Sequence, residues 1–258
     1  MRDHGAVDQL LREPGVTGER RAASALACRS LSAWHGARRA LVDVSLDVAY
    51  RGLTAVVGPN GSGKTSLLDC LDGLHACTGT VLLEGWDVGR LSTHRRVALG
   101  LARTFQTPVL AEGLDVLANI ALGTHHWDRG SPAALRTADD IAGLLGLGSR
   151  AHRPVATLTH PERRLVEIAR ALATRPRALM LDEPTAGFSH AEGMALCRLI
   201  LDAAAALDCA VLLVEHDVPL VMALADHVVV LDEGRVLASG RPAQVQQDSG
   251  VIAAYLGS

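Results

Sequence analysis

The stretch Gly58-Pro59-Asn60-Gly61-Ser62-Gly63-Lys64-Thr65 decides the fold of this chain. It follows the mostly apolar run Leu53 to Val57 and precedes the helical pattern of Ser66 to Leu74, so the order predicts a strand, a glycine-rich loop and a helix. Backbone N–H groups of such a loop form a nest for anions at the helix N-terminus, where the helix dipole also favours negative charge. Glycine is needed because a Cβ would hold the backbone away from the phosphates. The stretch therefore predicts a phosphate-binding loop, with a glycine-rich turn as the alternative.

The side chains at the end of this loop suit a nucleoside triphosphate. We expect Lys64 to span the β- and γ-phosphates and Thr65 to give a hydroxyl to Mg²⁺, with Ser66 completing the predicted binding segment. Lys64 is the single lysine among the 25 Lys and Arg residues. A compact ammonium fits between phosphate oxygens where a planar guanidinium does not. The one lysine thus stands where the two cations are least interchangeable.

Length and composition narrow the class of protein. A chain of 258 residues with 48% hydrophobic content can bury a substantial core, in one large domain or two small lobes. The net charge of -3, the 3% aromatic content and the lack of a basic run give no footprint for a nucleic-acid partner. The five cysteines are scattered without a Cys-x-x-Cys pair, which favours buried reduced thiols over zinc or disulfides. This composition suits a reducing cytosol.

The point at which regular apolar patterns begin along the sequence gives the expected start of the folded domain. Residues 1–22 are polar and interrupted by glycine and proline, so we expect a poorly ordered extension ahead of one domain over 23–258. The most apolar stretch, Val221 to Leu231, is interrupted by Asp226 and His227, which argues against a membrane-spanning helix. We expect a soluble or peripheral protein.

Two patterns of hydrophobicity divide the remainder. Alternating or apolar runs predict antiparallel strands leading into the glycine-rich loop, and two further short strands before Gln106. Residues from about 107 to 171 lack strand character and predict an inserted helical subdomain. The expected strands cover Leu26 to Leu31, Leu41 to Val48, Leu53 to Val57, Thr80 to Leu83 and Leu101 to Phe105, and the clearest helices cover Leu114 to Leu122 and Ala138 to Leu147.

Acidic residues and a histidine follow two later apolar runs. The run Ala178 to Leu181 ends in Asp182 and Glu183. A carboxylate at the tip of a buried strand beside a phosphate loop can hold Mg²⁺ through water, and the next acid can take a proton from attacking water. After an expected helix over Ser189 to Leu207, the run Val211 to Val214 leads through Glu215 to His216, at the tip of another buried strand. An isolated histidine there is more often structural.

The order of these motifs resembles the ATP-binding subunit of an ABC transporter. The motifs are the glycine-rich loop, Gln106, Arg163 to Arg170, Leu179 to Glu183, and His216. Three further stretches are similar to the branched-chain amino acid uptake subgroup, which includes urea and amide relatives. They are Arg103 to Gln106, Gly113 to Asn119 and Val251 to Gly257.

The resemblance implies an α/β fold, in which a RecA-like P-loop NTPase core sheet carries an N-terminal antiparallel β lobe and the inserted helical subdomain. It implies Glu183 as general base, His216 as γ-phosphate sensor, and Gln106 as a Mg²⁺ and water ligand near the membrane-subunit contact. Asp182 and Thr65 would hold the metal. The adenine-stacking position aligns with His35, beside Trp34, although exposed loop aromatics often have no such role.

The chain departs from this family in two places. Ser189 stands where an aspartate is usual, and Leu158-Thr159-His160-Pro161-Glu162 replaces the signature Leu-Ser-Gly-Gly-Gln, which in the family contacts the γ-phosphate held by a second subunit. Thr159 keeps a hydroxyl, but Pro161 lacks an N–H and Glu162 adds negative charge near a polyphosphate. We therefore expect an asymmetric heterodimer whose partner carries an intact signature. The alternative is a shifted loop in which Thr159 and neighbouring amides compensate.

Three functions fit these observations. The first is a subunit on the cytoplasmic face of the membrane that hydrolyses ATP and energises import through separate permeases, reaching a solute-binding protein only indirectly. The second is a soluble ABC ATPase in repair, translation or cluster assembly, which would normally bring a second cassette, a coiled coil or basic arms. The third is a nucleotide-responsive interaction module with little turnover, against which Glu183 and His216 argue.

Overall fold

The computed structural model of the chain describes residues 24–124 and 131–256, so the whole of the expected N-terminal extension, residues 1–22, lies outside the described residues. The strands are β1 (Leu26–His35), β2 (Arg38–Val48), β3 (Leu53–Val57), β4 (Cys77–Leu83), β5 (Trp86–Asp87), β6 (Leu101–Arg103), β7 (Ala178–Asp182), β8 (Ala210–Val214), β9 (His227–Asp232) and β10 (Arg235–Gly240). The helices are α2 (Lys64–Asp72), α3 (Thr93–Ala98), α4 (Val116–Ala121), α5 (Pro132–Leu144), α6 (His160–Ala173), α7 (His190–Ala206), α8 (Val218–Leu224), α9 (Pro242–Val245) and α10 (Ser249–Leu256). Short 3₁₀ turns cover Leu122–Thr124, Gly148–Arg150 and Val155–Thr157.

A six-stranded sheet in the order β10-β9-β3-β8-β7-β6 forms the centre of the molecule. Its pairs are parallel from β9 to β6, and β10 pairs antiparallel with β9. Every residue of β3, β7 and β8 is buried, because parallel strands are covered on both faces and their sequences are continuous apolar runs. β8 lies between β3 and β7, and because the three strands are parallel, their carboxyl ends meet at the same edge of the sheet.

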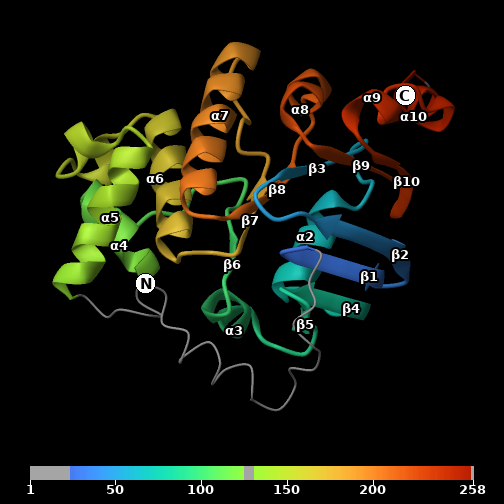
Figure 1. The fold of residues 1–258 in the computed structure, drawn as a ribbon, viewed down its shortest axis with the longest axis horizontal. Helices are drawn as coiled ribbons and strands as arrows, with labels where there is room; N and C mark the ends of the chain where they lie inside the picture. The colour runs from blue at the N-terminus through green and yellow to red at the C-terminus, as the bar shows by residue number, and fades with distance from the viewer. Residues whose placement is uncertain (1–23, 125–130, 257–258) are drawn as a thin grey trace.

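Alternate side chains of the central strands face two different layers. One face packs against α2 and a second sheet, while the other packs against α6, α7 and α8, and Figure 1 shows these layers on either side of the central strands. Val56, Met180, Leu212 and Val229 belong to the first core, and Val57, Leu181, Leu213 and Val230 belong to the second.

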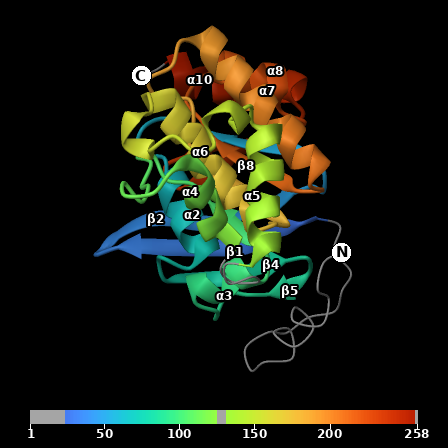
Figure 2. The ribbon, with the colours of Figure 1, turned by 90° about the vertical axis from the view of Figure 1, so that its left-hand side faces the viewer.

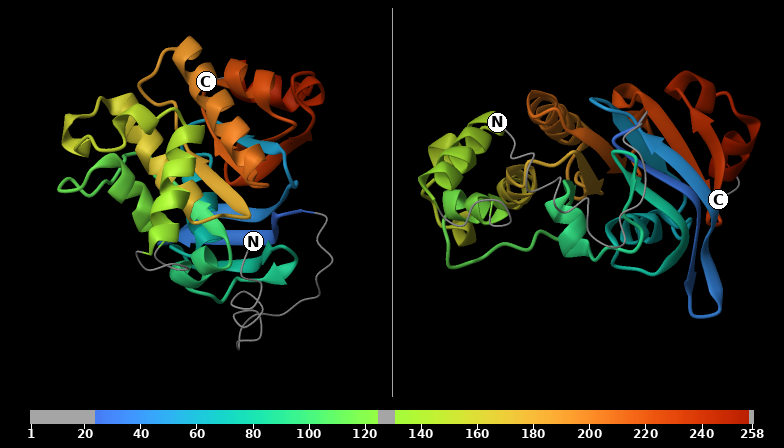
Figure 3. Two further views of the ribbon diagram at one scale, coloured as in Figure 1. Left: turned by 60° about the vertical axis from the view of Figure 1, so that its left-hand side comes forward. Right: turned by 60° about the horizontal axis from the view of Figure 1, so that its bottom comes forward.

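The second sheet is antiparallel, with the order β2-β1-β4-β5. Its main hairpin pairs Leu26 with Val48 and His35 with Arg38, so the chain turns at Gly36, whose φ of +61° favours glycine. Alternation along β2 buries Val44, Leu46 and Val48 against α2 and leaves the intervening residues exposed. Figure 3 shows this hairpin at the opposite end of the molecule from the α4 to α6 helices. The predicted antiparallel lobe is confirmed.

The stretch from α4 to α6 is helical, as its periodicity predicts. Asp115 caps α4 by accepting a hydrogen bond from the N–H of Ala118 at 2.7 Å, and Ser131 caps α5 ahead of Pro132. α4, α5 and α6 bury Ile120, Ile141 and Val166 in a common core. Figure 2 shows the three helices together in front of the central sheet.

Two strands were missed and one was given the wrong end. The run Val221 to Leu231 is interrupted near Asp226 and His227, as expected, since α8 ends at Leu224 and β9 begins at His227, but β9 and β10 were not predicted. Asp226 marks the break, since its carboxylate accepts a hydrogen bond from the Leu53 N–H at 2.8 Å. In addition, β6 ends at Arg103 and not at Phe105. Over residues 24–124 and 131–256, no helix has the length and apolar character needed to cross a membrane.

Candidate functional site

The glycine-rich loop joins β3 to α2 in a space that side chains would fill. A Cβ on Gly58 would lie 2.1 Å from the backbone oxygen of Leu231 in β9, far inside van der Waals contact. Gly63 has a φ of +105°, and a Cβ there would lie 2.7 Å from the backbone oxygen of Ala40. The loop backbone thus fits between β9 and the antiparallel sheet only because these positions are glycine.

The start of α2 presents donors with no protein partner. Its N-terminus has no side-chain cap, and within the described residues the N–H groups of Lys64 and Thr65 make no hydrogen bond. The Ser62 hydroxyl is buried and is also unpaired there. Unpaired amides at the N-terminus of a helix are the donors that phosphate oxygens accept from. The residues present therefore fit a polyphosphate.

Lys64 is folded back onto the loop. Its Nζ donates to the backbone oxygens of Gly58 at 2.8 Å and Pro59 at 2.9 Å. Burial lowers the pKa of Lys64, while the nearby carboxylates of Glu183 and Asp182 oppose that shift. The ammonium can therefore exchange two carbonyl partners for phosphate oxygens, which are stronger acceptors because they carry charge.

The ends of β7 and β8 bring the predicted acid and histidine together. Glu183 follows β7 with a φ of +45°, a left-handed conformation that is uncommon for residues other than glycine, and its N–H donates to Val214 at 2.9 Å. His216 follows β8, and its Nδ1 lies 3.9 Å from a carboxylate oxygen of Glu183. Asp182, the last residue of β7, is 2% exposed, and burial raises its pKa against the opposing effect of Arg103.

Glu215 is a buried member of the site that the sequence did not single out. One carboxylate oxygen accepts from the N–H and the hydroxyl of Thr185 at 3.0 and 2.6 Å, and the other accepts from the N–H of His216 at 3.1 Å. It thereby ties the loop after β7 to the residue that follows β8. Only the tertiary structure distinguishes this acid from Asp217, which caps α8.

The Q-loop segment, which we define as Thr104 to Leu110, is held by α6. The guanidinium of Arg164 donates to the backbone oxygens of Phe105 and Gln106, and Glu167 accepts from the N–H of Phe105 at 3.2 Å. Arg164 is fully buried and pairs with Glu167 at 2.8 Å. Sequence analysis did not identify either residue individually, because nothing local marks a buried ion pair.

The Gln106 side chain is exposed, and in the described part of the chain it makes no hydrogen bond. Thr65 is likewise exposed. The structure therefore brings neither side chain into a hydrogen bond with Asp182. Their predicted shared role at a metal remains a prediction.

His35 lies beside the start of α2. Its Nε2 is 3.0 Å from the hydroxyl of Ser66, and its ring centroid is 4.5 Å from that of His75, with the planes at 48°. The neighbouring Trp34 is exposed to solvent, and the guanidinium carbon of Arg39 lies 5.7 Å from the centroid of the Trp34 ring. His35 is therefore close to the nucleotide segment, and its stacking role remains a prediction.

The altered signature stretch forms the start of α6. Thr159 is the N-cap, and Glu162 accepts from its N–H at 2.8 Å and from its hydroxyl at 3.0 Å. Glu162 also pairs with Arg150, and the hydrogen bond from the Thr159 backbone is the main cause of the lowered pKa of Glu162. Pro161 lies in the first turn, where its missing N–H costs no helical hydrogen bond. Ser189 likewise caps α7, with Glu192 in the matching position.

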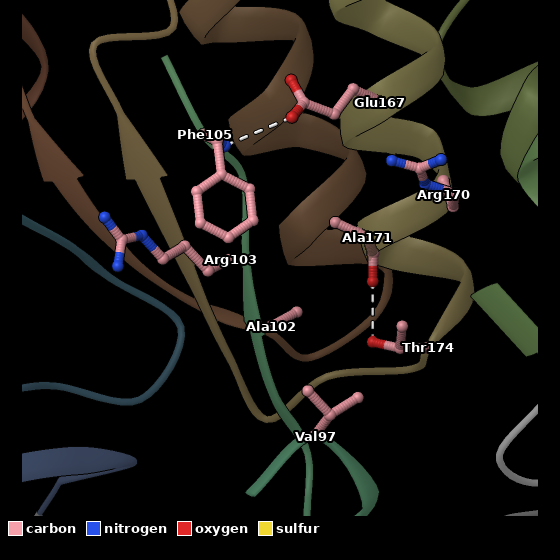
Figure 4. Close-up of a pocket in the computed structure, with 8 residues that line it drawn as sticks. All are labelled: Val97, Ala102, Arg103, Phe105, Glu167, Arg170, Ala171 and Thr174. Carbon is pink, nitrogen blue, oxygen red and sulfur yellow. Dashed lines mark hydrogen bonds between the residues drawn. The ribbon is translucent and has the colours of Figure 1, made fainter. Parts of the chain in front are cut away.

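A pocket of about 160 Å³ lies between β6 and α6, next to the Q-loop segment. Figure 4 shows the Phe105 ring between Arg103 and Glu167 at this site. The Arg103 guanidinium carbon lies 5.0 Å from the ring centroid, a separation at which a cation is attracted to an aromatic face. The lining residues are Val97, Ala102, Arg103, Phe105, Glu167, Arg170, Ala171 and Thr174.

Comparison with known protein families matches most of the folded chain. Residues 41–186 match the family model described as ABC transporter, which is more than half of the chain. Residues 235–258 match the model described as branched-chain amino acid ATP-binding cassette transporter. The first match spans the glycine-rich loop, the Q-loop segment and the end of β7.

Curated relatives extend the similarity over nearly their whole length. The chain is 35% identical over 238 residues to the high-affinity branched-chain amino acid transport ATP-binding protein BraF of Pseudomonas aeruginosa, covering 86% of this chain and 93% of BraF. It is 33% identical over 238 residues to LivG of Escherichia coli K12, which carries the same description, with the same coverage of each chain.

Solved structures agree with the fold. An ATP-binding cassette of an ABC transporter superposes with a TM-score of 0.83 at 28% identity, covering 91% of this chain and 99% of that one. An ADP-bound conformation of such a cassette gives a TM-score of 0.80 at 27% identity, covering 92% and 100%. The chain therefore belongs to the ABC transporter family, as one of its ATP-binding proteins that hydrolyse ATP.

Proposed function

We propose that this chain hydrolyses ATP to energise the import of branched-chain amino acids, or a related small solute, through separate permeases. The observation that carries this proposal is the match to BraF over 93% of its length, joined by the C-terminal match over residues 235–258. The paired ends of β7 and β8 support turnover, because Glu183 and His216 lie within 3.9 Å of each other beside the loop.

In this proposal the triphosphate lies on the N-terminus of α2. The amides of Lys64 and Thr65 and the buried hydroxyl of Ser62 donate to its oxygens, and Lys64 leaves the carbonyls of Gly58 and Pro59 for the same oxygens. The remaining residues of the nucleotide segment supply backbone contacts and close approach. That segment is Gly58, Pro59, Asn60, Gly61, Ser62, Gly63, Lys64, Thr65 and Ser66.

Mg²⁺ fits the same site. Asp182 has one buried carboxylate oxygen that lacks a partner among the described residues, and Thr65 has an exposed hydroxyl at the start of α2. Mg²⁺ in phosphate sites is typically held by one or two carboxylates together with substrate phosphates. We assign Asp182 and Thr65 to it, with Gln106 joining if the Q-loop segment moves. The ion supplies positive charge against the triphosphate when bound.

Hydrolysis then needs a base for the attacking water. Glu183 accepts the proton as water oxygen bonds to the γ-phosphorus, and the bond from that phosphorus to the ADP oxygen breaks. His216 lies beside this carboxylate and donates to the γ-phosphate. Glu215 orients His216 by holding its backbone N–H. A general base of this kind typically contributes a factor of about 10² to 10⁴.

The permeases are proposed to dock on the Q-loop segment and the residues after it. Phe105, Val109 and Leu114 are 45%, 69% and 37% exposed, which is unusual for large apolar side chains close together in sequence. Docking here would place the protein on the cytoplasmic face of the membrane, with the solute-binding protein reached only through the permeases. Because Arg164 and Glu167 hold the same segment, contact there acts directly on α6.

The second ATP-binding subunit is proposed to be a different chain with an intact signature. The hydroxyl of Thr159 is engaged by Glu162, so it must leave that carboxylate before it can donate to a phosphate on a partner. Arg150 neutralises Glu162, which makes repulsion a smaller part of this argument than the sequence alone suggests. The double change Pro161→Gly and Glu162→Gln tests it: ATPase activity of the isolated chain should rise, and an unmodified chain that forms an equally active ATP-dependent homodimer contradicts it.

Reconstitution tests the transport function. The chain is combined with its candidate permeases and ATPase partner in proteoliposomes, and ATP-driven uptake of labelled leucine is measured, with the Glu183→Gln variant as the matched control. Uptake that depends on Glu183 supports the proposal. ATP hydrolysis by the chain with no association with any permease would favour the soluble ABC ATPase instead.

A further inference from the structure

A buried guanidinium joins three carboxylates beneath the nucleotide segment. Arg103, the last residue of β6, donates from Nη1 to Asp69 and Asp72 of α2, both at 2.6 Å. From Nη2 it donates to the Oδ2 atom of Asp182 at 3.0 Å. The side chain of Arg103 is only 5% exposed. One cation therefore connects the helix that starts at the phosphate loop with the acid at the end of β7.

The two oxygens of Asp182 have different surroundings. Oδ2 is held by Arg103, whereas Oδ1 is buried and has no hydrogen-bond partner in the part of the chain that the structure describes. A carboxylate is planar and its Cβ is fixed by the backbone of β7, so the charge-assisted hydrogen bond that fixes the place of Oδ2 also fixes the place of Oδ1. The direction in which Oδ1 points is therefore set by Arg103.

Protein groups that orient a metal ligand without touching the metal affect metal affinity strongly. We propose that Arg103 is a positioning residue for Mg²⁺: by holding Oδ2 of Asp182, it presents Oδ1 to the ion that accompanies ATP. The inference rests on the proposed function, since it assigns Asp182 to that ion. Asp69 and Asp72 complete the arrangement because they anchor the other end of the guanidinium to α2. The link keeps Asp182 in register with the loop that holds the phosphates.

The chain offers a matched control in Arg96. This arginine is 2% exposed and donates only to backbone oxygens, among them Cys70 and Leu71 near the C-terminus of α2. Like Arg103 it is buried and braces α2, but among the described residues it makes no hydrogen bond to a carboxylate. If variants of both arginines lose metal-dependent ATP affinity, the cause is the lost support of α2. If only variants of Arg103 lose it, the cause is the effect of Arg103 on Asp182.

The experiment measures ATP affinity by titration calorimetry, once in EDTA and once in Mg²⁺, and Mn²⁺ affinity of the ATP complex by electron paramagnetic resonance. The variants are Arg103→Met, Arg103→Lys and Arg96→Lys in the full chain. For Arg103→Met we expect ATP affinity in EDTA within about twofold of the parent. The factor by which Mg²⁺ increases ATP affinity, which we call the gain from Mg²⁺, should fall about 10- to 100-fold. Arg103→Lys should lose less, because it keeps the charge without the fork. Arg96→Lys should keep the parental gain.

Several results overturn the inference. An Arg103→Met chain with the parental gain from Mg²⁺ contradicts it, and so does equal loss of affinity with and without metal. If Arg103→Met does not fold, Arg103→Lys decides, because a parental Mn²⁺ affinity in that variant is incompatible with positioning by the fork. Asp182→Asn tests the assignment of Asp182 to Mg²⁺ separately from the role of Arg103. If Asp182→Asn retains the full gain from Mg²⁺, the assignment of Asp182 under the proposed function fails, whatever Arg103 does.

Discussion

Replacing Gly58 by alanine should weaken nucleotide binding strongly while leaving the fold in place. The added Cβ would lie 2.1 Å from the Leu231 oxygen, so one backbone segment must move by more than 1 Å to reach ordinary contact. β9 is fixed by its pairing with β3, where Val57 lies opposite Val230, so the loop is the part that shifts. Such a shift misaligns the loop amides, and each charge-assisted hydrogen bond lost to a phosphate costs about 1.5 to 3 kcal/mol, or about 10- to 100-fold in affinity. Overpacking of this kind costs about 1 to 3 kcal/mol of unfolding free energy.

The assay compares ATP affinity by calorimetry with the thermal midpoint of the same samples. Gly143→Ala in α5 is the control, because a Cβ there meets nothing within 4 Å and alanine favours a helix. We expect Gly58→Ala to bind ATP about 10- to 100-fold more weakly while still unfolding cooperatively, and Gly143→Ala to bind like the parent. A Gly58→Ala chain that binds ATP within twofold of the parent refutes the argument that the tight approach to β9 sets the loop geometry.

Three further predictions concern the catalytic acid, the α6 ion pair and a thiol. Glu183→Gln should keep ATP binding and slow hydrolysis in the assembled complex by about 10² to 10⁴, and a parental rate would show that the base is misassigned. Arg164→Met leaves the buried Glu167 carboxylate without its cation, so urea unfolding should show a loss of about 3 to 5 kcal/mol in unfolding free energy, whereas Arg163→Met, at a half-buried arginine paired with the exposed Glu112, should lose far less. The Cys70 thiol lowers the pKa of Cys77 from 9.0 to about 7, so the reactive thiolate forms at lower pH. Alkylation of Cys77, followed by mass spectrometry, should be half-maximal near that value, and a half-maximum near 9.0 would contradict it.

The parts of the fold that could be predicted are those with a local pattern. Continuous apolar runs at β3, β7 and β8 and alternation along β2 determine burial directly, so these strands lie where expected. The same holds for the loop, since its glycines are needed for close approach. β9 was missed because its apolar run follows that of α8 after only two polar residues, and the long-range hydrogen bond from Leu53 to Asp226 at that break is not visible in the sequence.

The supporting residues of the site could not be predicted, because their partners are distant in sequence. Arg103 and Asp182 are 79 positions apart, and Arg164 lies 59 positions from Phe105. Glu215 is visible in the sequence only as one of several polar residues after a strand. The partners of Glu162 could not be predicted either: Arg150 and the N-cap of α6 engage its carboxylate, while its expected place near a partner's phosphate stays a prediction.

The hydrogen bonds between α6 and the Q-loop segment couple the position of that segment to the N-terminus of α6. Arg164 and Glu167 hold the backbone on both sides of the Phe105 side chain, and Thr159 begins the same helix about 7.5 Å earlier along its axis. A rigid helix held at its middle transfers any tilt to its end. A partner that binds the Q-loop segment and tilts α6 therefore changes the position of the α6 N-terminus. The coupling free energy between binding at the segment and binding at that N-terminus is the same in both directions. α6 therefore couples the two sites in either direction.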